Sequence, residues 1–320
     1  MPATEPMLPI RLIALDIDGT LIGDDLTISP RTRAAVQAAT ARGVAISLVT
    51  GRMVSSALRF ATELGLTGPL VGYQGGLIRA MPASDSARLG KLLMHTPLPA
   101  SAAQSILRWT REHGLDPHVN HLERFILRAD DPRADDYSSF MGARAELVDD
   151  LMTAIDHPVT KVLAVGDPPL PETMAPVARR DFHGVADVTI SHPRFLEFVA
   201  PGTSKGRAVR WLARRERVPL GATLAVGDQW NDLEMLAEVG HGAAMPTAPD
   251  GVQAVARYIA PPLSDDGVAQ LIEGLVLAPP AEAEAFADRL ASEAATRRPV
   301  EPPAEDVAAA DIADRREAAG

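Results

Sequence analysis

The 320-residue chain contains no cysteine. Disulfide bonds and cysteine-ligated metal centres are therefore excluded. Basic residues are fewer than acidic ones, 31 against 42, and the formal net charge is −11. No basic stripe offsets this charge, so we expect no nucleic-acid partner.

Long apolar runs are also missing. Nowhere do 18 apolar residues follow one another, so we expect no membrane span. The first nine residues hold three prolines and Glu5, and they lack the basic-then-apolar order of a signal peptide. We therefore expect a soluble, cytoplasmic protein.

Lysine is the scarcest of the charged residues. Only Lys91, Lys161 and Lys205 occur, and every other basic residue is arginine. Because lysine is so rare here, a lysine in this chain is less expected to be only a solvated surface charge than a lysine in an average protein. With 46% hydrophobic residues, a chain of this length can fill one or two cores, and we expect two domains plus a tail.

The most informative stretch is Leu12–Leu21, an apolar run that stops in Asp16-Ile17-Asp18-Gly19-Thr20. It predicts a buried strand that ends in a turn. Because side chains alternate along a strand, Asp16 and Asp18 project to one side at its carboxyl end, where α/β sheets bind ligands. Two such carboxylates repel each other unless a cation lies between them, and Mg²⁺ fits. The alternative is an acidic turn, since Asp-Gly is common in turns.

A second strand-then-helix unit follows. Ser29-Pro30 begins a helix that Gly43 ends, and strand 44–49 stops in Thr50-Gly51-Arg52. Two successive units of this kind predict a parallel sheet whose strands share one functional edge. Thr50 could therefore lie beside Asp16. A helix over 53–64 and a strand over 69–73 continue the pattern.

From about residue 80 to 195 the order of elements becomes mixed, which predicts an inserted α+β domain. Ser101 is expected to cap a helix, and residues 116–128 form an irregular extended stretch. The other elements that we expect are helices at 134–154 and 171–180 and strands at 161–165, 185–190 and 194–199.

After Pro201-Gly202 the alternation of strands and helices returns. Lys205 opens a helix, and strand 222–226 ends in Gly227-Asp228-Gln229-Trp230-Asn231-Asp232. A last helix is expected over 265–277. The tail from 279 is rich in alanine, proline and glutamate, with ten acidic and five basic residues in 281–320, and we expect it to be disordered or weakly helical.

Four stretches, in this order, resemble the signatures of the haloacid dehalogenase superfamily of phosphatases, in its Cof-type branch. They are Asp16–Thr20, Thr50–Arg52, Lys205 and Gly227–Asp232. The resemblance covers about residues 10–277. It implies an α/β fold with a Rossmann-like parallel sheet core and an inserted α+β cap of the large type-two class. The implied domains are a discontinuous core (10–80 and 200–278), a cap (81–199) and the tail (279–320).

The resemblance also implies roles for individual residues. Asp16 is the nucleophile that forms an aspartyl-phosphate, and Asp18 is the acid and base. Mg²⁺ is held by Asp16, the main-chain carbonyl of Asp18 and Asp228, with Asp232 close to the metal. The phosphoryl oxygens are held by Thr50, Gly51, Lys205 and Asn231. Gly19 and Thr20 form the turn.

Contacts to the leaving group are expected from the cap. The candidates are His118, Asn120 and Arg124, whose even spacing could place them on one face. The alternative is that they are surface polar residues on a half-exposed strand. Lys161 is expected to extend its ammonium to solvent or to pair with a carboxylate. Gln74-Gly75-Gly76 and Met245-Pro246-Thr247-Ala248 depart from the family pattern at loops near the site.

The sequence therefore predicts a Mg²⁺-dependent phosphatase of a small phosphorylated metabolite, with a sugar phosphate as the first candidate. A flavin precursor or pyridoxal phosphate is an alternative substrate, and a sugar phosphomutase is an alternative reaction. A non-enzymatic metabolite-binding protein is a further alternative. No membrane or nucleic-acid partner is expected, and the chain is expected to be a monomer or a homodimer.

Overall fold

The structure, a computed structural model, describes residues 9–83, 89–141 and 144–297. These residues form two compact units. The first unit comprises residues 9–48, 60–68 and 209–297, and the second comprises Val49–Arg59 and the described part of Pro69–Ala208. Two helices contribute to both units, α2 (Val54–Glu63) and α7 (Lys205–Glu216).

A five-stranded sheet organises the first unit, as predicted from the repeated strand-then-helix pattern. Every pairing in it is parallel. Strand β1, which lies between β12 and β2, is completely buried because neighbouring strands and helices cover it. In spatial order the strands are β14 (Tyr258–Ile259), β13 (His241–Ala244), β12 (Thr223–Gly227), β1 (Leu12–Leu15) and β2 (Ala45–Leu48).

The register of this sheet places two sequence motifs at the same edge. Leu15, the last residue of β1, lies opposite Val226 of β12. The chain that leaves β1 at Asp16 and the chain that leaves β12 at Asp228 therefore emerge side by side.

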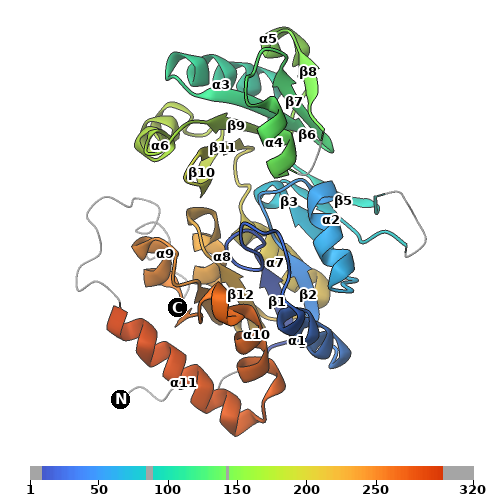
Figure 1. Cartoon of the computed structure of the whole chain (residues 1–320), viewed down its shortest axis with the longest axis vertical. Helices are drawn as coiled ribbons and strands as arrows, with labels where there is room; N and C mark the ends of the chain where they lie inside the picture. Colours follow the sequence, from blue (N-terminus) through green and yellow to red (C-terminus); the bar gives the residue numbers. More distant parts are fainter. Residues whose placement is uncertain (1–8, 84–88, 142–143, 298–320) are drawn as a thin grey trace. The chain divides into compact units, whose positions relative to one another are not determined.

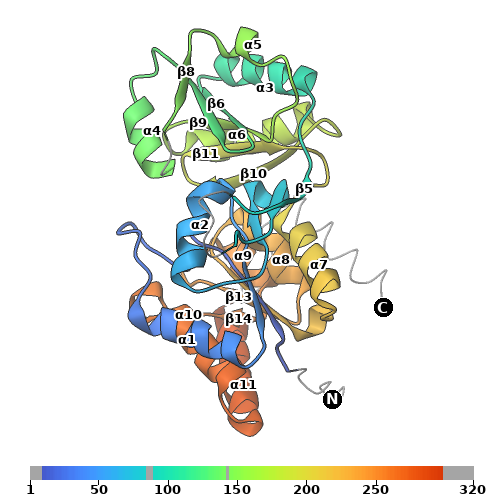
Figure 2. The same ribbon diagram turned by 90° about the vertical axis from the view of Figure 1, so that its right-hand side faces the viewer.

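Helix α1 (Pro30–Ala41) begins as the sequence predicts. Ser29 is the N-cap, since its hydroxyl accepts a hydrogen bond of 3.0 Å from the Thr32 amide. Helix α1 packs against α10 and against η5, the π-helical turn that follows α10 in the chain (Figure 2). This unit also contains α8 (Leu233–Glu238), α9 (Asp250–Val255), α10 (Gly267–Ile272) and η5 (Glu273–Leu277).

The first part of the tail, expected to be disordered or weakly helical, forms the helix α11 (Pro280–Arg297). Apolar side chains at helical spacing stabilise this helix. Ala283, Ala287, Leu290 and Ala294 are all buried, and α11 packs against η5 and β14 (Figure 2). Residues 298–320 lie outside the described part of the chain. Within the described residues, no helix is both long enough and apolar enough to cross a membrane.

A six-stranded sheet dominates the second unit, with α3 (Ala100–Glu112) and α6 (Leu170–Asp181) on one face (Figure 1). Trp109, Phe182 and Phe198 form edge-to-face ring contacts on that face. The strands, in spatial order, are β10 (Asp187–His192), β11 (Phe195–Val199), β9 (Lys161–Val165), β6 (Asp116–His121), β7 (Arg124–Arg128) and β8 (Glu146–Val148).

The same unit contains a small antiparallel sheet that follows the Thr50 loop in sequence. Val49 and Val71 form a parallel bridge, so this sheet begins beside the Thr50 loop. Its elements are β3 (Leu70–Gly72), the short 3₁₀ turn η1 (Tyr73–Gly75), β4 (Leu77–Arg79) and β5 (Leu92–His95).

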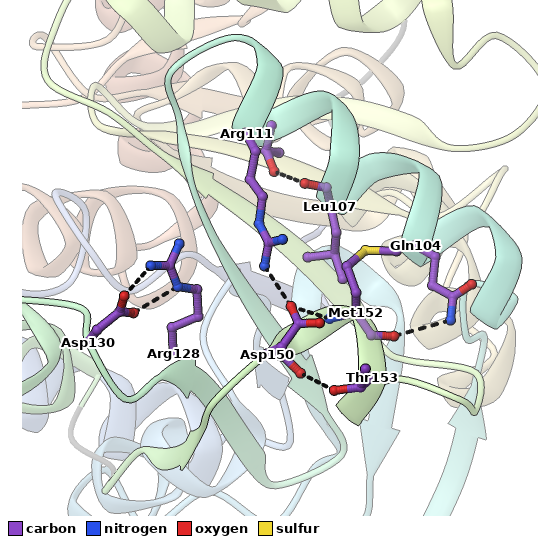
Figure 3. A network of polar contacts seen from close by, with 9 residues as sticks. Gln104, Leu107, Arg111, Arg128, Asp130, Asp150, Met152 and Thr153 are labelled. Atoms are coloured by element: carbon purple, nitrogen blue, oxygen red, sulfur yellow. Dashed lines mark hydrogen bonds and ion pairs between the residues drawn. The ribbon is translucent and has the colours of Figure 1, made fainter.

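Two local predictions in this unit are wrong. Residues 134–154 are not one helix, because they form α4 (Ala134–Met141), β8 and α5 (Leu151–Ala154). Asp150 caps α5 by accepting from the Met152 amide, and it also pairs with Arg111 of α3 (Figure 3). Helix α3 begins one residue before Ser101, after Pro99, whose fixed φ prepares the turn.

Candidate active site

The turn after β1 places Asp16 at the edge of the sheet and then reverses the chain. The Asp16 amide donates to the Val226 carbonyl at 3.0 Å, which ties the start of the turn to β12. The amides of Leu21 and Ile22 both donate to the Ile17 carbonyl. Gly19 has a φ of +74°, a conformation that favours glycine. The Asp16 side chain is buried, and Asp18 is half-buried.

The loop after β12 is shaped by one of its own carboxylates. Asp232 is completely buried, and its Oδ2 accepts hydrogen bonds of 3.0 Å from the amides of Asp228 and Gln229. Thr20, from the turn after β1, donates its hydroxyl to Asp228 Oδ1 at 3.3 Å. The two motifs are therefore joined by a direct side-chain contact.

Three carboxylates meet where these loops converge. Asp16, Asp228 and Asp232 each offer one oxygen, and these oxygens all lie within 4.8 Å of one another. Three negative charges this close repel each other strongly in a partly buried site. A divalent cation with a preference for hard oxygen ligands would relieve this repulsion, so the donor set fits Mg²⁺. The predicted contribution of Asp18 is its main-chain carbonyl, which stays a prediction.

Gly19 is required here for space as well as for backbone conformation. A Cβ on Gly19 would lie 2.3 Å from Asp228 Oδ2. We expect Gly19→Ala to lower the free energy of unfolding by about 1–2 kcal/mol through its positive φ alone, and also to displace the Asp228 carboxylate. Gly43→Ala is the matched control, because Gly43 has a φ of +82° and nothing lies within 4 Å of its Cβ position.

Denaturant unfolding and Mg²⁺ titration of both variants would separate these two effects. Both variants should lose stability, whereas only Gly19→Ala should require more Mg²⁺. Equal Mg²⁺ requirements in the two variants would contradict the role assigned to the Gly19 contact.

Thr50 begins a loop in the second unit that is held by main-chain hydrogen bonds. The Thr50 amide donates to the Val71 carbonyl at 3.0 Å, and the Gln74 amide donates to the Thr50 carbonyl at 3.1 Å. The Thr50 hydroxyl accepts from the Arg52 amide at 3.1 Å. It keeps its own O–H as a donor for a phosphoryl oxygen.

Lys205 is the first residue of α7 and is completely buried. The turn η1 packs against the start of this helix, since a Cβ on Gly75 would lie 2.5 Å from the Ser204 carbonyl oxygen. Gln74 of the same turn is hydrogen-bonded to Thr50. The structure therefore connects Thr50, Gly51 and Lys205 through η1, and it places all three in the second unit.

The three candidate cap residues are not on one face. His118 and Asn120 lie on β6, but the chain turns at Leu122, and Arg124 begins β7 opposite His121. Directly opposite residues share a face, so Arg124 faces away from His118 and Asn120. Arg124 is exposed and pairs with Glu146 at 2.7 Å. The expectation of a shared face is wrong for Arg124.

His118 and Asn120 are both completely buried, which excludes the surface-residue alternative for them. His118 Nε2 lies 3.3 Å from Asp131 Oδ2. Burial lowers the pKa of His118, although the hydrogen bond to Asp131 opposes that shift. Of the two ring nitrogens, Nε2 faces Asp131 and Nδ1 lies on the other side of the ring. That Nδ1 atom has no hydrogen-bond partner among the described residues.

Lys161 pairs with a buried carboxylate, as one of its two predicted alternatives requires. Its Nζ lies 3.0 Å from Oε2 of Glu197. From the sequence we expected neither this partner nor Gln74, whose Nε2 donates to the same Glu197 oxygen at 2.9 Å. Two features of the sequence could have pointed to this cluster: the scarcity of lysine, and Gln74, which departs from the family pattern.

The comparisons with known proteins agree with this geometry. A family model described as haloacid dehalogenase-like hydrolase matches residues 13–272. A 5-amino-6-(5-phospho-D-ribitylamino)uracil phosphatase of Bacillus subtilis is 28% identical, over 82% of this chain and 96% of that protein. An HMP-PP phosphatase of Serratia proteamaculans is 30% identical, over 74% of this chain and 84% of that protein.

A solved structure of a similar protein has the same fold. A haloacid dehalogenase-like hydrolase from Bacteroides thetaiotaomicron superposes with a TM-score of 0.70 and 27% identity, and the match covers 82% of this chain and 98% of that chain. The predicted α/β core with added sheets is confirmed. The family model matches most of this chain, and an acidic cluster lies where the strands end. The chain therefore belongs to the haloacid dehalogenase-like hydrolases.

Proposed function

We propose that the chain hydrolyses the phosphomonoester of a small metabolite through an aspartyl-phosphate on Asp16, with Mg²⁺ as cofactor. The observation that carries the proposal is the cluster of Asp16, Asp228 and Asp232, whose oxygens lie within 4.8 Å of one another. A buried aspartate among other carboxylates becomes a useful nucleophile toward a phosphate only when positive charge offsets the repulsion.

The proposed reaction has two steps. Asp16 attacks phosphorus, the bond from phosphorus to the leaving oxygen breaks, and Asp18 gives its proton to that oxygen. Asp18, now ionised, takes a proton from water, whose oxygen attacks the phosphorus of the aspartyl-phosphate. The bond between Asp16 and phosphorus then breaks, which releases phosphate and restores both carboxyl groups.

Positive charge and hydrogen-bond donors are assigned to the phosphoryl oxygens. Lys205 supplies a buried ammonium, and Thr50 supplies a hydroxyl from a loop fixed by main-chain hydrogen bonds. Gly51 contributes its main-chain amide, and Asn231 its side-chain amide. Such donors stabilise the charge that develops in the transition state.

Asp16, Asp228 and the main-chain carbonyl of Asp18 would hold the metal. Mg²⁺ at this position would neutralise charge on the phosphoryl group and on the nucleophile. Asp232 has a supporting role, because its Oδ2 already accepts two main-chain amides and so fixes the Asp228 loop.

The leaving group is proposed to be a sugar. Relatives of this chain are named as phosphatases of different substrates, which supports the phosphatase chemistry and leaves flavin-precursor and pyridoxal phosphates as alternatives. A phosphomutase would need a second sugar hydroxyl in place of water as the acceptor. Phosphate release without a bisphosphate activator would separate hydrolysis from mutase chemistry.

The experiment is a phosphate-release screen with Mg²⁺ over sugar phosphates, nucleotides, flavin mononucleotide and pyridoxal phosphate. We expect the highest kcat/KM among the sugar phosphates. Chelation should abolish release, and added Mg²⁺ should restore it. Release that persists in excess chelator would contradict the proposed mechanism, and a preference for flavin mononucleotide would favour the alternative substrate.

The cap residues give a separate prediction about substrate affinity. Neither Oδ1 nor Nδ2 of Asn120 has a hydrogen-bond partner of normal geometry within the described part of the chain. The Asn120 amide does lie near Tyr73, where it opposes the rise that burial causes in the Tyr73 pKa. An unsatisfied buried amide is suited to a ligand hydroxyl. We expect Asn120→Ala to raise KM for the best substrate by about tenfold, the value of one polar contact.

Arg124→Ala is the matched control from the same hairpin. It removes an exposed ion pair with Glu146, which contributes little to stability, and it should leave KM unchanged. Steady-state kinetics on both variants make the comparison. A larger effect of Arg124→Ala than of Asn120→Ala would contradict the assignment.

A further inference from the structure

A buried ion pair in the second unit lies against the Thr50 loop, and the proposed mechanism does not use it. The Lys161 and Glu197 side chains are 2% and 3% exposed, with Nζ and Oε2 3.0 Å apart. They lie on neighbouring strands, β9 and β11, and on the face of the sheet opposite to Phe198. Removing two charges from water this completely is costly, so the arrangement calls for a reason beyond stability.

The contacts of the pair point to the Thr50 loop. Lys161 Nζ donates to the Gly51 carbonyl at 3.0 Å and lies 5.6 Å from the centre of the Tyr73 ring. Glu197 accepts from Gln74 Nε2 at 2.9 Å and from the Ser191 hydroxyl. Gln74 in turn donates its main-chain amide to the Thr50 carbonyl. The ion pair therefore holds the Thr50-Gly51 segment from two directions.

The packing at Gly51 shows how closely this segment is fitted. A Cβ on Gly51 would lie 2.4 Å from Gln74 Nε2 and 3.4 Å from Glu197 Oε1. Gln74 has a φ of +59°, which is uncommon for a residue with a side chain. Its strained conformation is held by the hydrogen bonds to Glu197 and Thr50.

We propose that Lys161 and Glu197 are positioning residues that fix the Thr50-Gly51 segment, through the Gly51 carbonyl and Gln74, in the orientation that binds the phosphoryl group. This inference rests on the proposed function. The pair touches neither substrate nor metal in this proposal. It fixes the segment that carries the two proposed phosphate donors, the Thr50 hydroxyl and the Gly51 main-chain amide. Misplacement of such donors by about 1 Å can cost about 100-fold in rate.

The test replaces both charges together, because a single replacement would leave one buried charge without its partner and the variant could fail to fold. Lys161→Met with Glu197→Gln keeps the volume of both side chains. The amide oxygen that Glu197→Gln introduces can still accept from Gln74, and its NH2 group can donate to the Ser191 hydroxyl. The main losses are therefore the charges and the bond to Gly51. We expect inhibition by inorganic phosphate to weaken about tenfold or more, and kcat for an aryl phosphate to fall by about 10- to 100-fold.

Two further measurements distinguish positioning from a general loss of structure. The midpoint of Mg²⁺ activation should stay at the wild-type value, since the carboxylate cluster lies in the first unit. Phe198→Leu, on the opposite face of the same sheet, should lower the melting temperature without weakening inhibition by phosphate. A melting temperature that falls equally in both variants, with equal phosphate inhibition, would overturn the proposal.

A cycle with Thr50→Val tests whether the pair acts through this loop. If it does, adding the double replacement to Thr50→Val should cost much less than it costs in the wild-type chain. Losses that multiply in full would overturn the inference while leaving the proposed function intact. A wild-type protein that releases phosphate from no ester in the screen would instead overturn the proposed function.

Discussion

Replacing Asp16 with asparagine is expected to abolish phosphate release, with a fall in kcat of about 10⁴-fold or more, as is typical when a covalent nucleophile is removed. The substitution keeps the shape of the side chain and the main-chain hydrogen bond to Val226. It removes a negative charge from a site where three carboxylates converge. We therefore expect the variant to be at least as stable as the wild type, which separates lost chemistry from lost folding.

The matched control is Asp24→Asn, an exposed aspartate a short distance along the same loop. It should keep wild-type kcat and KM. Transfer of the phosphoryl group can also be measured directly, since wild-type protein quenched in acid during turnover should carry phosphate on Asp16 and the variant should carry none. Activity of Asp16→Asn at the wild-type level would refute the aspartyl-phosphate mechanism.

Asp16 and Asp228 of the acidic cluster could be predicted because each follows a short, strongly apolar strand, and Asp232 belongs to the same motif as Asp228. Strands of this kind are recognised locally, and the rule that parallel strands present their carboxyl ends at one edge brings Asp16 and Asp228 together without further information. The register of Leu15 opposite Val226 confirms that part of the argument. The family, the fold class and the class of enzyme followed from the same motifs, and the comparisons confirm them.

The cap was harder to predict because its decisive features are not local. The hairpin between His121 and Arg124 turns without glycine or proline, since Leu122 itself adopts a φ of +52°. Even spacing in the sequence therefore suggested one face where the structure has two strands. The partner of Lys161 lies on a separate strand and is fixed only by the strand order of the sheet. Helix α11 depends on packing of small alanine side chains, which carry a weak hydrophobic signal.

The expected domain boundaries at 80/81 and 199/200 remain a prediction. The two compact units divide the chain differently, because the Thr50 loop and the start of α7 belong to the same unit as the predicted cap strands. The ion pair of Lys161 and Glu197 is one of the contacts between the Thr50 loop and these strands. Of the residues proposed to bind phosphate, Thr50, Gly51 and Lys205 therefore belong to the second unit, whereas Asn231 belongs to the first unit, as do the residues proposed to bind metal.

Asp228→Asn is expected to raise the Mg²⁺ concentration needed for half-maximal activity by about 10- to 100-fold. The amide oxygen can still accept from the Thr20 hydroxyl, which Asp228 Oδ1 does in the native chain, so the loop should keep its position. Only a charge is lost, and Mg²⁺ prefers charged oxygen ligands. Activity at saturating Mg²⁺ should recover in part, since Asp16 remains available as the nucleophile.

Two measurements would establish that the effect of Asp228→Asn arises at the metal. Mg²⁺ should raise the melting temperature of the wild type, because a ligand that binds only the folded state stabilises it, and the shift should be smaller in the variant at the same Mg²⁺ concentration. Asp288→Asn, an exposed aspartate of α11, controls for the loss of one negative charge from the same unit. If Asp228→Asn and Asp288→Asn shared the wild-type Mg²⁺ midpoint, Asp228 would not be a ligand, and the acidic cluster would need another explanation for its three converging charges.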